Sequence, residues 1–345
     1  MSDYIVELRE SARQVVDGAG TPAYEETTWP LIVELGWLLT AVPEELGGLG
    51  LGLQGACALH TELGRGLAQA PFLPAMLALE AVCHGEPADR AGLVERLTGG
   101  ELATAPLAEP DLSLDAGGAL SGLAPAVQSA DRARYVLLWT HDADCVALVS
   151  PQQAGVQLTE RSTWDVTRRL FDLRLTQVAL DEQSVLARGA TARALVARLQ
   201  VVRDFSLAAD AVGGAAALLD MTVEHLQTRQ QFGRPLALFQ ALKHRCADLR
   251  TQLAAAESLL LDGLAQSGDE PDDAGAGLRS QKAKFLACTV FSTVAEEALQ
   301  LHGGIGMAAE HPCHFFLKRA MLGEHLGERE YGYERVIADR FLEQL

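Results

Sequence analysis

The chain has 345 residues, with 28 Lys and Arg against 46 Asp and Glu, and therefore a formal net charge of −18. A surface this acidic argues against nucleic acid as a partner, because phosphate backbones are bound by clustered cations. Hydrophobic residues make up 48% of the chain and charged residues 21%, which excludes wholesale disorder. No apolar run approaches the ~20 residues of a bilayer span, and the N-terminus lacks a signal-peptide pattern. We expect a cytoplasmic protein with no membrane association.

Residues 1–100 are expected to form an N-terminal helical domain. Apolar residues recur there at the three- and four-residue spacing of amphipathic helices. The five segments are Val6 to Val16, Trp29 to Leu39, Leu51 to Leu67, Pro74 to Val82 and Ala88 to Leu97. Pro43 and the glycines of residues 47–50 predict a loop before the third segment.

Residues 101–188 are expected to form a small, barrel-like β domain. Short runs of β-branched and aromatic residues alternate there with turn residues. The predicted strands are Tyr135 to Trp139, Cys145 to Val149, Gly155 to Leu158 and Leu170 to Leu175.

Residues 189–345 return to a helical period and predict an antiparallel four-helix bundle. Its third helix is predicted over Arg279 to His302 and its fourth over Cys313 to about Leu342. The fold class is therefore mainly α with a small β domain. The six cysteines are scattered without a C-x-x-C pair or metal-ligand spacing, which predicts free thiols and no metal site.

Two segments at helix ends could carry chemistry. In RQQFGRP at 229–235, Gly233 and Pro235 are helix-stop residues, whereas Arg229 and Phe232 have the spacing of a clamp for a planar anionic ligand. In QLHGGIG at 300–306, one or two glycines fit a helix C-cap, and all three leave backbone that a phosphate could approach. The segment is not a Rossmann fingerprint, since no strand precedes it.

These segments belong to a larger set of motifs that resembles the acyl-CoA dehydrogenase family. PEELGGLG at 43–50 follows Gly36-Trp37, and Glu62 to Arg65 reads ELGR. RQQFGRPLALFQALKHRCADL at 229–249 and QLHGGIGMAAEHP at 300–312 complete the set. The resemblance spans nearly the whole chain and implies helical, β and bundle domains, an FAD cofactor, an acyl-CoA substrate and a separate electron acceptor.

The resemblance also assigns residues to the cofactor. Arg229 would meet the FAD diphosphate, and Phe232 would pack beside the cofactor of a neighbouring subunit. The remaining predicted FAD contacts are Leu236, Gln240, Gln300, Gly303 and Gly304. Because such residues serve a flavin bound mainly by another subunit, a homodimer, a homotetramer or a heterotetramer with a longer homologue is implied.

The match fails where the family keeps its catalytic base. One family position falls on Gly327, and the other, 26 residues before Arg229, falls on Arg203. Asp204 is next to Arg203 and is the candidate base, with a helix N-terminal Asp as the alternative reading. Ala105 to Pro110 resembles the family segment A-L-T-E-P, but the Gly-Ser-Asp and much of the first β hairpin that should follow are missing.

Three functions follow from this pattern. The first is an FAD-dependent oxidoreductase subunit of lipid metabolism that takes part in α,β-desaturation of an acyl-CoA thioester. The second is a catalytically incomplete, flavin-binding partner subunit, motivated by the two empty base positions. The third is a flavin-dependent oxygenase on the same fold, because a fold does not determine its chemistry.

Overall fold

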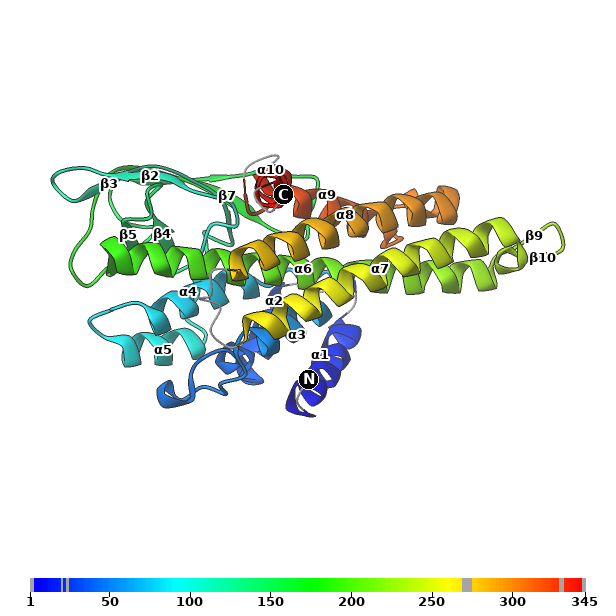
Figure 1. Ribbon diagram of the computed structural model, residues 1–345, viewed down its shortest axis with the longest axis horizontal. Coiled ribbons are helices and arrows are strands. Elements are labelled where there is room, and N and C mark those ends of the chain that lie inside the picture. Colours follow the sequence, from blue (N-terminus) through cyan, green and yellow to red (C-terminus); the bar gives the residue numbers. More distant parts are fainter. Residues whose placement is uncertain (1–2, 20, 23–24, 269–274, 329–331, 343–345) are drawn as a thin grey trace.

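The computed structural model describes residues 3–19, 21–22, 25–268, 275–328 and 332–342 (Figure 1). The N-terminal part is helical, as predicted: α1 (Asp3–Ala19), α2 (Glu25–Glu34), α3 (Gly52–Arg65), α4 (Phe72–His84) and α5 (Arg90–Thr98). The predicted helix Trp29 to Leu39 is too long. It ends at Glu34, because Gly36 has a φ of +68°, and a short 3-10 turn, η1 (Trp37–Leu39), follows.

The β domain consists of two four-stranded sheets that pack on each other. One has the order β1 (Ala103–Thr104), β4 (Tyr135–Trp139), β5 (Cys145–Val149) and β8 (Val185–Arg188). The other has the order β2 (Asp111–Leu114), β3 (Ala119–Gln128), β7 (Leu170–Ala179) and β6 (Val156–Glu160). Buried side chains of both sheets, such as Leu120 and Leu138, form a core between them. The sequence predicts that much of the first hairpin of the β domain is missing. The structure nevertheless has a hairpin there, formed by β2 and β3.

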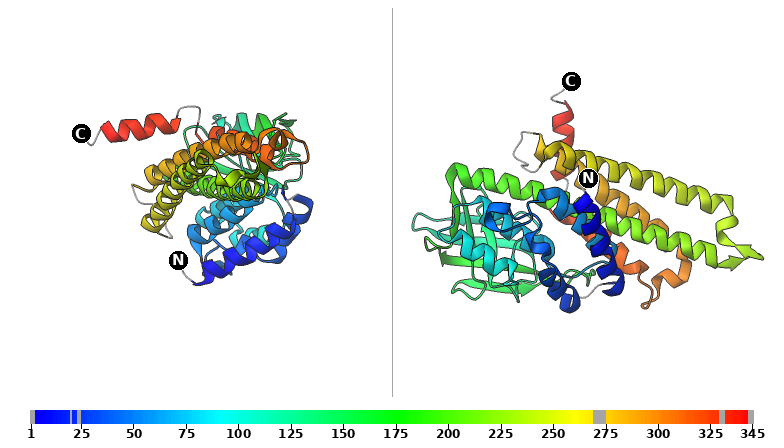
Figure 2. Two further views of the ribbon diagram at one scale, coloured as in Figure 1. Left: turned by 90° about the vertical axis from the view of Figure 1, so that its right-hand side faces the viewer. Right: turned by 90° about the horizontal axis from the view of Figure 1, so that it is seen from below.

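The bundle is built around one long helix, α6 (Gly189–Thr228). It packs against α7 (Gln240–Ser267) and α8 (Ala276–His302), and on its other side against α3 and α4 of the N-terminal part (Figures 1 and 2). By length and composition α6 alone among the described helices could cross a membrane, but 67% of its apolar window is buried inside the protein. Its apolar composition is therefore that of a central core helix.

The predicted fourth bundle helix is two helices, α9 (Cys313–His325) and α10 (Gly332–Leu342). The chain leaves the helical path at Gly327, which has a φ of +92°. There the backbone N–H of Gly327 donates to the carbonyl of Leu107, 2.7 Å away, and the residue bridges to Ala108. A partner 220 residues away in sequence therefore ends α9, which helical periodicity could not reveal. α10 projects from the side of the bundle (Figure 2).

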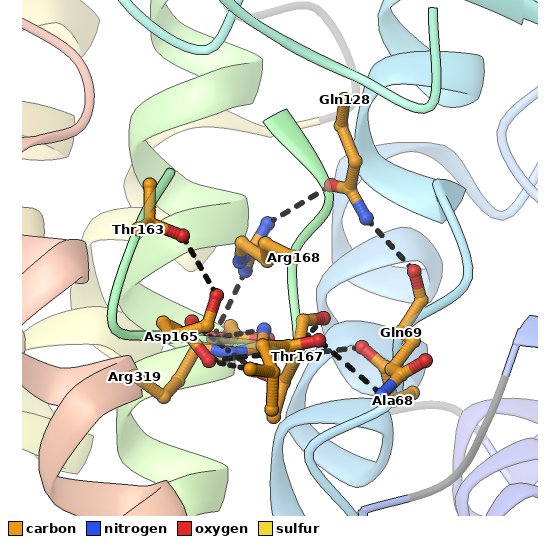
Figure 3. A network of polar contacts seen from close by, with 10 residues as sticks. Ala68, Gln69, Gln128, Thr163, Asp165, Thr167, Arg168 and Arg319 are labelled. Atoms are coloured by element: carbon orange, nitrogen blue, oxygen red, sulfur yellow. Dashed lines mark hydrogen bonds and ion pairs between the residues drawn. The ribbon is translucent and has the colours of Figure 1, made fainter. Parts of the chain in front are cut away.

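A buried polar network holds the three parts together (Figure 3). Arg319 of α9 is 2% exposed and donates to the hydroxyl of Thr167, to the carbonyl of Ala68 and to Asp210 of α6. Arg168 pairs with the same Asp210 at 3.1 Å. The network links the loop before β7 to the bundle and to the connection between α3 and α4. A single buried guanidinium thus fixes the arrangement of three separate segments.

Candidate functional site

The segment after α6 forms a tight hairpin at one end of the bundle. α6 ends at Thr228, and β9 (Gln230–Gln231) pairs antiparallel with β10 (Arg234–Pro235). The two turn residues, Phe232 and Gly233, have φ values of +53° and +74°, the conformation that two-residue hairpins favour. Positive φ is uncommon for an aromatic residue, and the Phe232 side chain is 89% exposed. The hairpin therefore presents an aromatic ring to solvent.

Arg229 stands at the base of this hairpin and is exposed. Its guanidinium makes no hydrogen bond or ion pair to any residue that the structure describes. By contrast, the guanidinium of Arg234 lies over the ring of Phe239, 4.1 Å from its centroid. Of the two arginines in the hairpin segment, Arg229 is the one whose guanidinium has no partner among the described residues.

The second glycine-rich segment lies at the same end of the bundle (Figure 1). Gly303 caps α8 with a φ of +64°, and its N–H donates back to Gln300 and Leu299. A Cβ at Gly303 or Gly304 would meet no atom within 4 Å, so the backbone there is open. Gln300 is exposed as well. Both the cap and the open backbone expected from the sequence are present.

Leu236 and Gln240 complete the predicted set. Leu236 is half-buried and begins the 3-10 turn η3 (Leu236–Leu238), while the exposed Gln240 is the first residue of α7. The structure thus brings all seven predicted cofactor contacts to one end of the bundle. We call this end the bundle tip.

Gly327 and Arg203, the two positions that the motif resemblance predicts for the family base, lie elsewhere, in a buried polar cluster. The hydroxyl of Tyr333, on α10, donates to Asp204 at 2.8 Å and accepts the N–H of Glu328 at 3.1 Å. A Cβ on Gly327 would lie 1.9 Å from that hydroxyl and 3.4 Å from the Asp204 carboxylate. A side chain at Gly327, where the motif resemblance places the family base, would therefore collide with the Tyr333 hydroxyl.

Arg203 and Glu109 form the other half of this cluster. Arg203 is 1% exposed, donates to Asp204 at 3.0 Å and pairs with Glu109. Burial acts to lower the pKa of Arg203, but the charges of Asp204 and Glu109 hold it well above its usual value. Burial and the charge of Asp204 raise the pKa of Tyr333 well above that of free tyrosine. The cluster is a compensated set of charges around a neutral phenol.

Asp204 is 2% exposed, so a substrate would have to displace Tyr333 to reach its carboxylate. A cavity of about 350 Å³ adjoins the cluster on the β-domain side, and Asp204 is not part of its wall. The lining residues are Glu109, Pro110, Trp139, His141, Ala143, Val196, Gln200 and Glu328. In this arrangement Asp204 accepts hydrogen bonds from a phenol and a guanidinium, as a structural carboxylate does.

The tip and the cluster are far apart in this chain. Asp204 and Arg229 lie on or at the end of the same helix, 25 residues apart. At 1.5 Å per residue that is about 38 Å, longer than one dinucleotide. A dinucleotide bound by Arg229 would therefore serve a reaction centre other than the one at Gly327 of the same chain.

Comparison with known proteins places this arrangement in a family. The acyl-CoA dehydrogenase C-terminal domain model matches residues 192–332, and the N-terminal domain model matches residues 5–101. The acyl-CoA dehydrogenase IpdE2 of Mycobacterium tuberculosis H37Rv is 34% identical over 327 residues, which cover 91% of this chain and 89% of the relative. The chain belongs to the acyl-CoA dehydrogenase family. The resemblance of its motifs to that family is confirmed.

Solved structures of the family share the fold. The ChsE4–ChsE5 complex from Mycobacterium tuberculosis superimposes with a TM-score of 0.87 at 25% identity, covering 99% of this chain and 98% of that one. The Tcur3481–Tcur3483 steroid ACAD also gives a TM-score of 0.87, at 26% identity, with coverage of 99% and 98%. The helical, β and helical order of this acyl-CoA dehydrogenase is therefore that of its relatives.

Sequence reasoning missed the residues that fill the base position and those that support the tip. Tyr333 and Glu109 reach Asp204 and Arg203 from segments far away in sequence, so no local spacing marks them. His225 and His302 did have a local signal. Each stands in the last turn of a helix that leads into a predicted cofactor segment.

Proposed function

We propose that this acyl-CoA dehydrogenase subunit takes part in α,β-desaturation of an acyl-CoA thioester as the partner of a longer homologue. The tip would supply Arg229, Phe232 and the Gly303-Gly304 backbone to an FAD that is seated mainly on the other subunit. The observation that carries the proposal is the separation of about 38 Å, along one helix, between Arg229 and this chain's own base position.

The tip fits the diphosphate half of FAD. A buried diphosphate needs a fixed cation, and the tip offers the unpaired guanidinium of Arg229. A ligand can approach the backbone of Gly303 and Gly304 closely, although the Gly303 N–H is already bonded in the helix cap. FAD supplies, when bound, the acceptor for the hydride that leaves the acyl chain. The residues of this chain bind and orient that group, and the proton is removed by a carboxylate of the partner.

Two relatives support the heteromeric form and the substrate class. The ChsE4–ChsE5 structure is a complex of two different chains, and the Tcur3481–Tcur3483 protein is a steroid ACAD. We therefore propose a CoA thioester of a bulky, ring-bearing acid as the substrate to test first, beside straight-chain acyl-CoAs. The measurement is reduction of an electron-acceptor dye.

The test compares three preparations: this chain alone, a longer homologue alone and the two co-expressed. We expect the co-expressed complex to be yellow and to reduce the dye with acyl-CoA, and this chain alone to reduce none. Turnover by the lone chain would show that the partner is dispensable. In that case the Asp204→Asn variant decides whether Asp204 is the base, since it should abolish desaturation while retaining FAD.

Arg229→Ala tests the tip directly. Loss of a charge-assisted contact, typically about 1.5–3 kcal/mol, should weaken FAD binding by about 10- to 100-fold without changing the circular dichroism spectrum. Arg250→Ala is the matched control, because Arg250 is an exposed arginine on α7 outside the tip. Equal flavin occupancy in the parent and the Arg229→Ala variant would contradict the assignment.

A further inference from the structure

Three histidine rings, here called the stack, contact one another directly behind the tip. The rings of His225 and His302 are stacked, with centroids 4.5 Å apart and planes inclined by 27°, whereas the His311 ring lies 4.8 Å from His302 and is tilted by 60°. His225 precedes Arg229 by four residues, or about 6 Å of helix, and His302 immediately precedes Gly303. The stack therefore joins the two segments that carry the proposed diphosphate contacts.

The central ring has an unused acceptor. Nδ1 of His302 lies 2.8 Å from the carbonyl of Ala298, and a carbonyl can only accept, so this nitrogen carries the hydrogen. Nε2 of His302 is then a lone pair, and it has no partner among the described residues although the side chain is 5% exposed. A buried acceptor without a donor is rare and calls for a proton or a ligand.

The outer ring is also oriented. Nδ1 of His311 accepts the backbone N–H of Cys313 at 3.2 Å, which leaves the hydrogen of the neutral ring on Nε2. The Cys313 thiol lies 4.0 Å from Nδ1 of His302. The three rings are thus carried by α6, by α8 and by the segment just before α9.

The groups that act electrostatically on the stack are cationic or neutral. Arg229 acts on His225, His314 acts on His311, and the three rings act on one another. No carboxylate acts on them within the described part of the chain. Burial lowers the pKa of each of the three imidazoles, and the neighbouring histidines lower it further. The stack is thus neutral at neutral pH, although both helix ends favour a positive charge.

We propose that His225, His302 and His311 form a proton-accepting layer of the diphosphate site, which takes up a proton from solvent when a dinucleotide binds at the tip. The proposal rests on the proposed function, since it needs the anion beside Arg229. The proton bonds to the free Nε2 of His302 and converts that imidazole to imidazolium. The positive charge stays on the His302 ring and attracts the phosphates through space, so these histidines act as positioning residues.

The consequence is a pH-dependent affinity with a definite sign. Binding that takes up one proton strengthens as pH falls, by up to tenfold per pH unit between the pKa values of the free and bound states. The arginine and the glycine backbone do not titrate in this range, so without the stack the affinity should be flat. A change of affinity with pH is therefore evidence that the histidines take up a proton on binding.

Calorimetry on the co-purified complex tests the proposal. FAD, and separately ADP-ribose as a probe of the diphosphate half whose phosphates do not titrate near neutral pH, are titrated at several pH values and in two buffers of different ionisation enthalpy. The expected result is an uptake approaching one proton near neutral pH and a Kd that rises with pH. Zero uptake with intact FAD binding would overturn the histidine proposal and leave the proposed function standing. Failure of both ligands to bind at every pH would overturn the proposed function itself.

The His302→Asn variant tests whether Nε2 of His302 is the atom that takes up the proton. Its side-chain N–H can still donate to the Ala298 carbonyl, but Nε2 is gone, so the slope should vanish while the Kd at high pH stays within about twofold of the parent. His325→Asn, at the exposed end of α9, is the control and should keep the full slope. If the His302→Asn protein does not fold, His302→Gln, which also lacks a titrating nitrogen, gives the same test. A parental slope in the folded stack variant, or a lost slope in the control, would overturn the proposal.

Discussion

Gly327→Ala tests whether the family base position is filled by the chain's own side chains. The left-handed backbone at φ +92° costs a residue with a Cβ about 1–2 kcal/mol. The new Cβ would lie 1.9 Å from the Tyr333 hydroxyl, and the backbone cannot retreat without breaking its 2.7 Å bond to Leu107. The hydroxyl must move instead and lose its bond to the Asp204 carboxylate, at about 1.5–3 kcal/mol. We expect a total destabilisation of about 2.5–5 kcal/mol.

The assay is urea unfolding followed by far-UV circular dichroism, with Gly118→Ala as the control. Gly118 has a φ of +82°, but a Cβ there would meet no atom within 4 Å, so this variant should lose only the dihedral cost of about 1–2 kcal/mol. In the Gly327→Ala/Tyr333→Phe double variant the clashing hydroxyl is absent. Because each single variant loses the same bond to Asp204, the cost of the double variant should fall below the sum of the single variants by about 1.5–3 kcal/mol. Equal losses in the two glycine variants would refute the reasoning.

The same geometry has a functional consequence. A carboxylate introduced by Gly327→Glu would have to displace Tyr333 from Asp204 before it could face a substrate. We therefore expect this variant to gain no desaturase activity on its own. Dye reduction by the lone Gly327→Glu chain would contradict that expectation.

Three further predictions concern buried groups elsewhere in the chain. Burial lowers the pKa of His60 to about 3, against the opposing charge of Asp210, so the unfolded chain binds a proton below about pH 6.5 that the folded chain does not. The free energy of unfolding should therefore fall as pH drops from 7 to 5, by at most ~1.4 kcal/mol per pH unit from this group. If the urea midpoints of the parent and the His60→Phe variant change equally with pH, His60 is not the cause. Burial raises the pKa of Cys57 and Cys83 to about 12 and that of Cys288 and Cys313 to about 11. Cys246 is the one cysteine that is not buried, so a thiol reagent at pH 8 should modify it first. All six cysteines should react only after unfolding. If the Cys246→Ser variant still showed a fast phase of thiol modification, Cys246 would not be the first cysteine to react. Arg319→Met leaves Asp210 and Asp165 short of a buried partner and should cost about 3–5 kcal/mol, whereas Arg335→Met, on an exposed i,i+4 pair of α10, should cost under about 0.5 kcal/mol.

Local patterning in the sequence was sufficient for most of the architecture. The period of apolar residues located the helices of the N-terminal part and of the bundle, and β-branched runs located β4 and β5 to the residue. The motif RQQFGRP was enough to end α6, because glycine and proline act within a few residues of themselves. The family and the end of the bundle that carries its cofactor motifs were thus readable from the chain alone.

What the tertiary structure decided depends on contacts between distant segments. The break of α9 at Gly327 needs the carbonyl of Leu107, and the filling of the base position needs Tyr333 from α10. Neither has a sequence period, because each bond joins residues that the chain brings together only after folding. The hairpin conformation of Phe232 and the packing of two other histidine rings against His302 have the same origin. The sequence supplies the side chains of the site, and long-range packing determines which of these side chains come into contact.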